Sequence, residues 1–245
     1  MKLSNRATPC LSGAREVSSW IRFAGGVAIL GASTSAGANG IALNEQSASS
    51  AGTAYAGRSS SALDASTIFG NPAGLTKLKR TEISGGAAVI SVSDDISNAQ
   101  SSAPGTNKGD SVPLGVVPFV YMSTPLDDRF SIGLGLYAPS GLINDYENSF
   151  QGRYHGSYST TKEVTLQPTI AYRINDYVSI GGGPTINRFT AKLKNDLATG
   201  ALNNGQDTEV TIKGDDTALG YNLGILFNLS EATSWGINYH SKVDY

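Results

Sequence analysis

The side chains best suited to catalysis or metal binding are few in this chain. Its histidines are His155 and His240, and its single cysteine is Cys10. A zinc site needs several nitrogen, sulfur or carboxylate ligands at characteristic spacings, and neither histidine has such neighbours in the sequence. The glycine-rich runs LGLYAPSG and SIGGGP contain neither a P-loop nor a GxGxxG motif. We therefore expect no catalytic residue, no metal, no cofactor and no enzyme activity.

The charged residues also exclude one class of partner. They make up 16% of the chain, with a net charge of −2. A nucleic-acid-binding protein normally carries a strong excess of basic residues. We therefore expect no nucleic acid partner.

Residues 1–38 have the order of a secretory signal peptide. The basic residues Lys2, Arg6, Arg15 and Arg22 precede a short apolar run at residues 23–33, and the small residues AGA follow at 36–38. We expect cleavage near Ala38. A buried N-terminal helix is the alternative. Because Cys10 falls inside this signal, the mature chain would have no thiol and no disulfide.

The rest of the chain has the alternation expected of β-strands. No apolar run after residue 40 is long enough for a spanning helix, so a membrane span would have to be a strand. Apolar and polar residues alternate in several segments, which predicts one apolar and one polar face on each strand. We predict about seven strands, near residues 81–93, 112–124, 129–139, 161–173, 177–194, 216–229 and 234–245.

The predicted strand from residue 177 changes phase near Asn187 and Arg188. Before this point the apolar residues are even-numbered, and after it they are odd-numbered. Either a β-bulge lies there, or the strand has left the bilayer and its faces are no longer constrained. We favour the second interpretation.

The connections between these strands alternate between short turns and long polar loops. Residues 124–129, 173–176 and 230–234 are short turns, whereas residues 94–110, 140–159 and 195–216 are long. That alternation is typical of outer-membrane β-barrels. A periplasmic or secreted β-sandwich is the alternative, but its strands are usually shorter. We predict an all-β, transmembrane antiparallel β-barrel over residues 81–245.

Residues 39–80 do not alternate and are rich in Ala, Ser and Gly. Asp64 is predicted to cap a short helix over residues 65–68. Asn71 is predicted to cap a second helix whose first residue is Pro72, where a missing N–H has no cost. Short helices of small residues cannot build a core alone. We expect them to fill a confined space such as the lumen of a barrel.

Residues 40–80 resemble the N-terminal hatch of the FadL family of outer-membrane hydrophobic-compound transporters, which includes the TodX-like branch. The shared marks occur in order: Leu43-Asn44-Glu45, GTAYAG at residues 52–57, Asp64-Ala65 and Asn71-Pro72-Ala73. The ending INYHSKVDY is similar to a segment midway along the family's barrel. The resemblance covers essentially all of residues 40–245.

The resemblance implies a fold and a route for ligand. The family fold is a 14-stranded barrel plugged by a small hatch, so seven strands imply a truncated chain carrying the N-terminal half. The implied domains are a signal peptide at residues 1–38, a helical hatch at 39–80 and half a barrel at 81–245. Family members take up long-chain fatty acids or aromatic hydrocarbons by passive diffusion. Ligand docks among outer loops, passes the hatch and leaves laterally at a kinked third strand.

Residues of this chain are assigned to each step of that route. For substrate binding we expect apolar and cationic side chains near the outer loops: Leu193, Leu197, Leu202, Arg188 and Lys192. The cations are expected to face the lumen, and Arg173, Lys194 and Lys242 are further candidates. For hatch and gating we expect Asn71, Pro72, Ala73 and Glu45. Gly133 and Gly135 would mark the lateral-opening strand, or simply make room for the hatch.

The expected location is the outer membrane of a Gram-negative cell. The expected partners are a hydrophobic small molecule, outer-membrane lipid and lipopolysaccharide, and a full-length protein is expected to be a monomer. The alternative function is a structural or adhesive barrel whose loops bind host or phage partners. Fatty acid and aromatic hydrocarbon are not distinguished by these residues.

Overall fold

The computed structural model describes residues 42–97, 100–107, 111–199, 206–230 and 232–245. These residues belong to one compact unit, Ile41–Tyr245. The predicted signal peptide, its cleavage site and Cys10 lie outside the described residues. Within the described ranges, none of the helices combines the length and the apolar character that a bilayer span requires.

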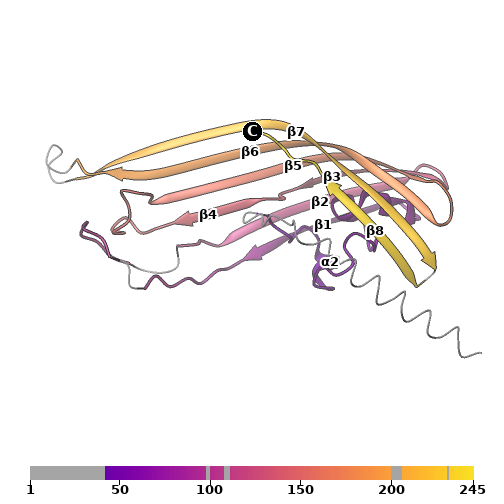
Figure 1. Cartoon of the computed structure of the whole chain (residues 1–245), viewed down its shortest axis with the longest axis horizontal. Helices are drawn as coiled ribbons and strands as arrows, with labels where there is room; N and C mark the ends of the chain where they lie inside the picture. Colours follow the sequence, from indigo (N-terminus) through magenta and orange to yellow (C-terminus); the bar gives the residue numbers. More distant parts are fainter. Residues whose placement is uncertain (1–41, 98–99, 108–110, 200–205, 231) are drawn as a thin grey trace, which may run out of the picture. The chain divides into compact units, whose positions relative to one another are not determined.

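A single antiparallel sheet makes up most of this unit (Figure 1). Its strands follow the order β1-β2-β3-β5-β6-β7-β8, and β4 pairs with β5 beyond the end of β3. The bounds are β1 Glu82–Ile90, β2 Gly115–Pro125, β3 Phe130–Tyr137, β4 Gly141–Asp145, β5 Tyr158–Arg173, β6 Val178–Leu197, β7 Thr208–Ser230 and β8 Thr233–His240. Apart from β4, strands adjacent in the sequence are therefore adjacent in the sheet, as in an up-and-down barrel wall.

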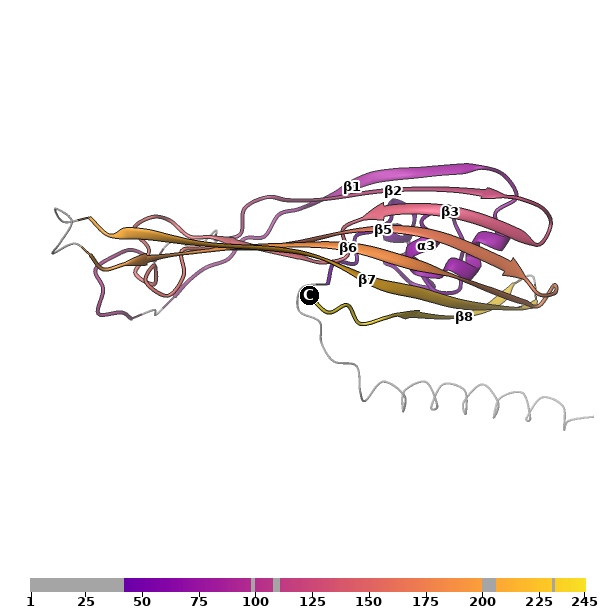
Figure 2. The ribbon, with the colours of Figure 1, turned by 90° about the horizontal axis from the view of Figure 1, so that it is seen from above.

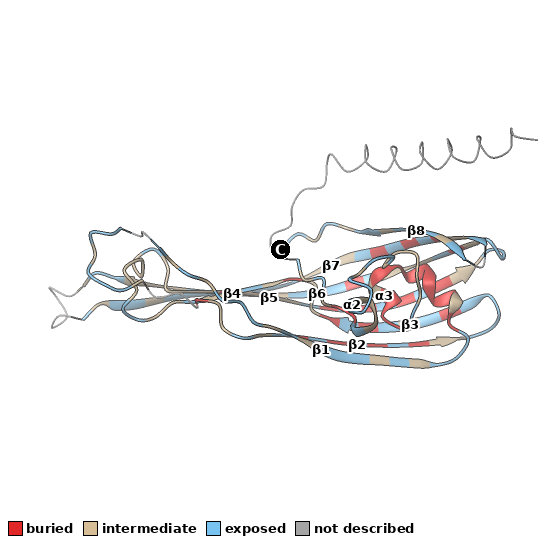
Figure 3. Ribbon diagram, turned by 90° about the horizontal axis from the view of Figure 1, so that it is seen from below, coloured by how far each residue is buried: buried red, intermediate tan, exposed pale blue. Residues whose placement is uncertain are grey.

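The sheet is curled, and short helices lie on its concave side (Figures 2 and 3). These are α2 (Ala48–Ala51), α3 (Thr67–Gly70) and the 3-10 helix η2 (Pro72–Lys77). We call residues 42–78 the N-terminal segment. Helix η2 contacts the inner faces of β2, β3, β5, β6 and β7. The buried core of the unit therefore lies between this segment and the sheet.

The two faces of the sheet have opposite polarity. In β2 the odd-numbered residues, such as Phe119 and Tyr121, are buried against the N-terminal segment, whereas Val120 and Met122 are exposed on the outer face. In β5 the buried residues Thr165 and Gln167 are polar, and their exposed neighbours are apolar. A water-soluble sheet would hide its apolar face. The exposed apolar face is what a barrel wall presents to lipid.

The predicted wall strands are confirmed, with three corrections. The last strand, predicted to reach residue 245, ends at His240. The other two corrections concern the end of the sheet that carries the long loops, which we call the outer end. Residues 140–159 are not all loop, because β4 pairs with the first residues of β5. Residues 208–216 are not loop either, because β7 begins at Thr208 and pairs with β6 as far as Leu197. These pieces lack alternation, which is why a pattern of apolar residues does not reveal them. Figure 1 shows β6 and β7 extending well past β1 and β3.

The phase change in β6 is not a β-bulge. The register of β6 with β7 is continuous from Val178 to Leu197, and Asn187 and Arg188 pair in sequence with Ala218 and Thr217. Of the two interpretations, the unconstrained outer strand is therefore the one consistent with the pairing. The strand continues straight through while the pattern of its side chains changes.

Candidate functional site

Asn71 joins the helices of the N-terminal segment to the wall. Its side-chain oxygen accepts a hydrogen bond from the Ala73 N–H at 3.0 Å, so it caps η2, which begins at Pro72. Its side-chain N–H groups donate to the carbonyls of Ser59 at 2.6 Å and Ile225 at 3.0 Å. The predicted cap is confirmed, and the bond to Ile225 ties Asn71 to β7 of the wall. Asn71 is almost completely buried, so each polar atom of its amide needs these partners.

The helix predicted after Asp64 begins later than expected. Helix α3 starts at Thr67, and its N-cap residue, Ser66, makes no side-chain capping bond. The Asp64 carboxylate instead accepts the Ser66 N–H at 2.8 Å. Asp64 therefore orders the turn before the helix rather than its first residue.

Polar side chains of the wall hold the free carbonyls at the end of α3. Gln167 and Asn222 both donate to the Ile68 carbonyl, at 3.2 and 3.1 Å. Asn238 donates to the Phe69 carbonyl at 3.2 Å, and a ring nitrogen of His240 lies 3.2 Å from the same oxygen. The last carbonyls of a helix have no partner within the helix, and here the wall supplies the donors. His240 therefore faces inward.

These amides were not among the predicted site residues. Gln167, Asn222 and Asn238 each stand on the polar face of an alternating strand. An amide on the inner face of a barrel strand can point to water or to a plug, and only the structure shows which. The sequence signal was therefore present, but it did not single these residues out.

The wall carries glycines where the N-terminal segment lies closest to it, because a larger side chain would not fit there. A Cβ at Gly181 would lie 2.6 Å from the backbone nitrogen of Ala73, which is closer than real contacts allow. A Cβ at Gly133 would lie 2.7 Å from the Ile68 side chain, and one at Gly135 would lie 3.1 Å from it. Gly133 and Gly135 thus make room for α3.

An apolar cluster fills the remaining space between segment and wall. Its buried members from the segment include Ile68 and Leu75, and those from the wall include Phe119, Tyr121 and Tyr137. The rings of Tyr121 and Tyr137 are stacked 5.8 Å apart. Apolar burial of this kind stabilises the docked position of the segment. Predicted gating residues Pro72 and Ala73 are fully buried here, whereas Glu45 is half-buried.

The third wall strand is interrupted three residues after Gly135. Strand β3 ends at Tyr137 and β4 starts at Gly141, and their registers with β5 differ by one residue. The N-terminal segment pairs with the break: the Leu43 N–H donates to the Pro139 carbonyl at 2.8 Å, and the Gln46 side chain donates to the Ala138 carbonyl at 2.6 Å. The break lies beyond the predicted glycines, which are paired on both sides.

A cavity of about 360 Å³ lies among the outer parts of the strands. Leu193 of β6 and Ile212 of β7 are partners in the ladder, and both line it. Lys194 lines it too, and its ammonium group lies 2.9 Å from the Glu209 carboxylate and 5.9 Å from the centre of the Tyr158 ring. The other lining residues are Asn144, Tyr146, His155, Gly156, Tyr158, Ser159 and Asn195. The cavity is therefore lined by both apolar side chains and a cationic one.

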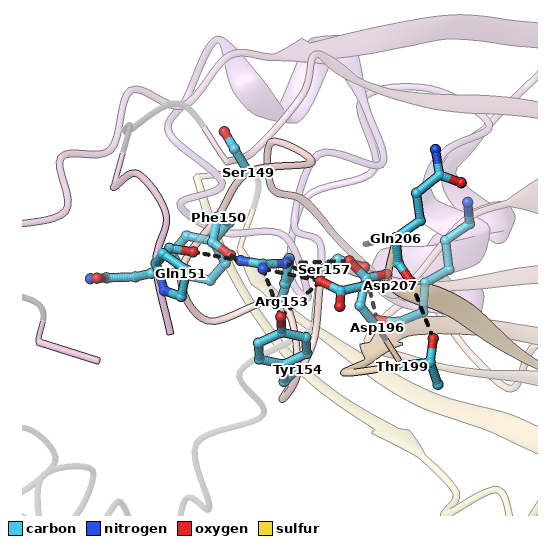
Figure 4. Close-up of polar contacts among 12 residues, drawn as sticks. Ser149, Phe150, Gln151, Arg153, Tyr154, Ser157, Asp196, Thr199, Gln206 and Asp207 are labelled. Carbon is cyan, nitrogen blue, oxygen red and sulfur yellow. Dashed lines mark hydrogen bonds and ion pairs between the residues drawn. The ribbon is translucent and has the colours of Figure 1, made fainter. Parts of the chain in front are cut away.

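A network centred on Arg153 holds the loop beside this cavity (Figure 4). The guanidinium donates to the Asp207 carboxylate at 3.1 Å and to the Pro104 carbonyl at 2.9 Å. The Tyr154 hydroxyl donates to the same carboxylate at 2.7 Å. The hydrogen bond from Tyr154 is the main cause that lowers the pKa of Asp207, and the hydrogen bond from Arg153 lowers it further. Three stretches far apart in sequence are thereby tied together at the outer end.

The remaining predicted binding residues are more scattered. Leu197 is exposed near the end of β6, and Leu202 lies outside the described residues. Lys192 stands 5.1 Å from the centre of the Tyr158 ring. Arg188 is on the outer face of β6 beside Ile186, where it pairs with Asp215 of β7. The expectation that Arg188 faces the lumen is wrong, because even-numbered residues of β6 point outward there.

Comparison with known proteins identifies relatives of this architecture. The chain is 30% identical over 237 residues to the long-chain fatty acid transport protein of Escherichia coli O6:H1, covering 89% of this chain and 53% of that protein. Among solved structures, a Pseudomonas aeruginosa FadL homologue matches with a TM-score of 0.65 and 21% identity, over 83% of this chain and 53% of that one.

A second solved structure shows the same fold. It is the TodX deltaS2S3 mutant, a monoaromatic hydrocarbon channel, which matches with a TM-score of 0.53 and 16% identity, over 76% of this chain and 54% of that one. The chain spans about half the length of the relatives it matches.

The family match covers most of the chain. Residues 29–245 match the family described as outer membrane protein transport protein (OMPP1/FadL/TodX). Its members are outer-membrane transport channels and not enzymes, which confirms the expected location and the expected lack of enzyme activity. The chain therefore belongs to the OMPP1/FadL/TodX family of outer membrane transport proteins.

Proposed function

We propose that this chain forms part of a channel for the passive uptake of long-chain fatty acids or other hydrophobic small molecules across the outer membrane. One observation carries the proposal: the N-terminal segment is fitted into the curl of the sheet by Asn71, wall amides and glycines. With the segment fitted in this way, the lumen inside the curled sheet would be closed to water. A closed lumen suits an apolar solute better than a hydrated one.

The cavity near Leu193 is the proposed first contact for ligand. Leu193 and Ile212 offer apolar surface to a hydrocarbon chain, and Lys194 offers a cation to a carboxylate. Lys194 is better placed than the predicted Arg188, because Lys194 lines this cavity and Arg188 does not. A fatty acid would use both parts of the cavity, and an aromatic hydrocarbon only the apolar part.

The N-terminal segment is the proposed hatch. Asn71, Pro72 and Ala73 fix its position against β6 and β7, while residues 48–61 are more exposed. In this mechanism the buried part stays docked and ligand passes beside it. No step needs an energy source, because the solute moves down its own concentration gradient.

The break between β3 and β4 is the proposed lateral exit. There the ladder to β5 shifts register, and the segment satisfies the freed carbonyls through Leu43 and Gln46. A shift of those few residues would open the wall towards lipid. Outer-membrane lipid and lipopolysaccharide would surround the wall, and the full-length protein is proposed to act as a monomer.

The experiment is uptake by cells that lack their own fatty-acid transporter and express the full-length gene. Cells with the gene should accumulate a labelled long-chain fatty acid faster than cells without it. Lys194→Gln should slow fatty-acid uptake and leave toluene uptake unchanged, while Leu193→Asn should slow both. Lys213→Gln is the matched control, since Lys213 is a neighbouring lysine of β7 that does not line the cavity. Equal uptake with and without the gene would overturn the proposal.

A further inference from the structure

The wall has a second interruption, between β5 and β6. Residues on either side of it pair in one register, with Leu166 opposite Ile186 and Ile170 opposite Gly182. Between these pairs, residues 167–169 of β5 have no ladder partners among residues 183–185 of β6. Since the register is the same before and after, no residue is inserted. The ladder is open at this point rather than shifted.

The cause is a pair of prolines that face each other. The continuous register sets Pro168 of β5 directly opposite Pro184 of β6. Odd-numbered residues of β5 hydrogen-bond towards β3 and β4, as Glu163 and Arg173 show, so the even-numbered Pro168 faces β6.

Strand β6 has the complementary arrangement. The Tyr177 carbonyl accepts from Asn228, next to β7, and the Val178 carbonyl accepts from Ile174, on the β5 side. Even-numbered residues of β6, including Pro184, therefore face β5. Proline has no N–H, so both hydrogen bonds of this pair are missing.

Strand β5 also steps inward here. The carbonyl oxygen of Pro168 occupies the place where a Cβ of residue 183 would stand, so only glycine is tolerated at that position. Odd-numbered residues of β6, such as Thr185, point to the inner side. The backbone of β5 therefore lies inside that of β6 at this level, and Gly183 makes the step possible.

The seam between these strands lies at the level of the apolar outer band and of the N-terminal segment. On the outer face it is flanked by Leu166, Ile170 and Ile186, all exposed. On the inner face Gln167 closes it, accepting from the Tyr137 hydroxyl at 2.6 Å and donating to the Ile68 carbonyl at 3.2 Å. The same side chain thus touches both the seam and the segment.

We propose that this seam, at Pro168, Gly183 and Pro184, is a second lateral gate for apolar ligand, separate from the break in the third strand. It opens when Gln167 releases Ile68, so movement of the segment and opening of the wall are coupled. Apolar side chains on the lipid side would receive the ligand. The gate rests on the proposed function, but whether the seam opens can be measured without transport.

The first measurement is amide hydrogen exchange of the full-length protein in lipid nanodiscs. Backbone amides of Leu166, Ile170, Gly182 and Ile186 should exchange faster than those beside Pro118. The double variant Pro168→Val, Pro184→Val restores both N–H donors and should slow exchange at the seam about tenfold. Pro118→Val is the matched control: Pro118 also faces outward, but its strand pairs without a gap with β1. Equal rates at the two places in the native protein would overturn the seam.

The second measurement is uptake of a labelled long-chain fatty acid by the same variants. The double variant should reduce uptake severalfold while Pro118→Val leaves it unchanged. If the double variant slows exchange at the seam but takes up fatty acid as fast as the native protein, the gate is overturned, since closing the seam would then not affect transport. Absence of uptake by the native protein would overturn the proposed function and the gate's role in it, and exchange would still decide whether the seam opens.

Discussion

At the scale of single residues, Asn71 carries more contacts than any capping role requires. It caps η2, and it also donates to Ser59 within the segment and to Ile225 in β7. Replacement by alanine removes the cap and leaves the carbonyls of Ser59 and Ile225 without these donors. We expect Asn71→Ala to destabilise the docked segment by about 2–3 kcal/mol. The measurement is faster hydrogen exchange of residues 66–78.

The control for this variant is Asn44→Ala. Asn44 is exposed and accepts a hydrogen bond from Arg58, so its loss should leave the exchange of residues 66–78 unchanged. Equal exchange in Asn71→Ala and the native protein would mean that the segment is held by apolar packing alone.

Asp207 is the residue from which a pH dependence follows. The Tyr154 hydroxyl and the Arg153 guanidinium donate to its carboxylate, and these bonds lower its pKa. A carboxyl group whose folded pKa is lowered stabilises the fold above its unfolded pKa, and this contribution is lost as pH falls through the folded value. Order in the Arg153 network should therefore weaken in acid.

This expectation can be tested by a carbon-13 NMR titration of aspartate carboxyl groups in the full-length protein. Tyr154→Phe removes the first hydrogen bond and should raise the pKa of Asp207 towards the ordinary aspartate value. An unchanged Asp207 titration in Tyr154→Phe would contradict the assigned cause.

At the scale of elements, the fit between η2 and β6 depends on a glycine. Gly181→Val would place its side chain against the backbone of Pro72 and Ala73. We expect a loss of about 1–3 kcal/mol from overpacking, with the segment more open to protease and the strand still paired. Gly214→Val is the matched control, because a Cβ at Gly214 in β7 meets nothing within 4 Å. Equal protease sensitivity in the two variants would refute the fit.

Alternation reveals the wall strands because one face meets lipid and the other meets the segment. Phe130, Ile132, Leu134 and Leu136 show this rule, since all are exposed on the outer face of β3. The rule fails where neither face is apolar, as in the first part of β7, whose strand character depends on its partner β6. It also fails for Arg188: its polarity suggested an inward side chain, but the pairing with Asp215 holds it outside.

The residues expected to cap helices predicted one helix start correctly and another incorrectly. Asn71 and Pro72 stand at the start of a helix as expected, because each has a local backbone reason to be there. Asp64 does not cap a helix, because its carboxylate accepts the Ser66 N–H in the turn before α3. The gap between Pro168 and Pro184 required knowledge of the register, since the two residues lie on consecutive strands and each alone is tolerated in a strand.

At the scale of the whole described unit, many polar side chains of the wall are buried and many of its apolar side chains are exposed. Gln167 and Asn222 are fully buried inside the curl, while Leu219, Ile237 and Trp235 are exposed outside. The side-chain N–H groups of both amides donate to the Ile68 carbonyl of the segment, which lowers the cost of burying them. This inversion is stable only if lipid covers the outer face, as the family's location requires.

The fluorescence of Trp235 can test whether lipid covers the outer face of the wall. Trp235 is 54% exposed on the outer face of β8 close to the short turn between β7 and β8, and it pairs with Phe227. The chain has two tryptophans, so Trp20→Phe leaves Trp235 as the only one. Aromatic residues of barrels gather at the membrane interface. We therefore expect lipids brominated near the headgroup to quench its fluorescence more than lipids brominated near the chain end. Emission typical of a water-exposed indole, with no quenching by either lipid, would mean that this end of the wall is outside the bilayer.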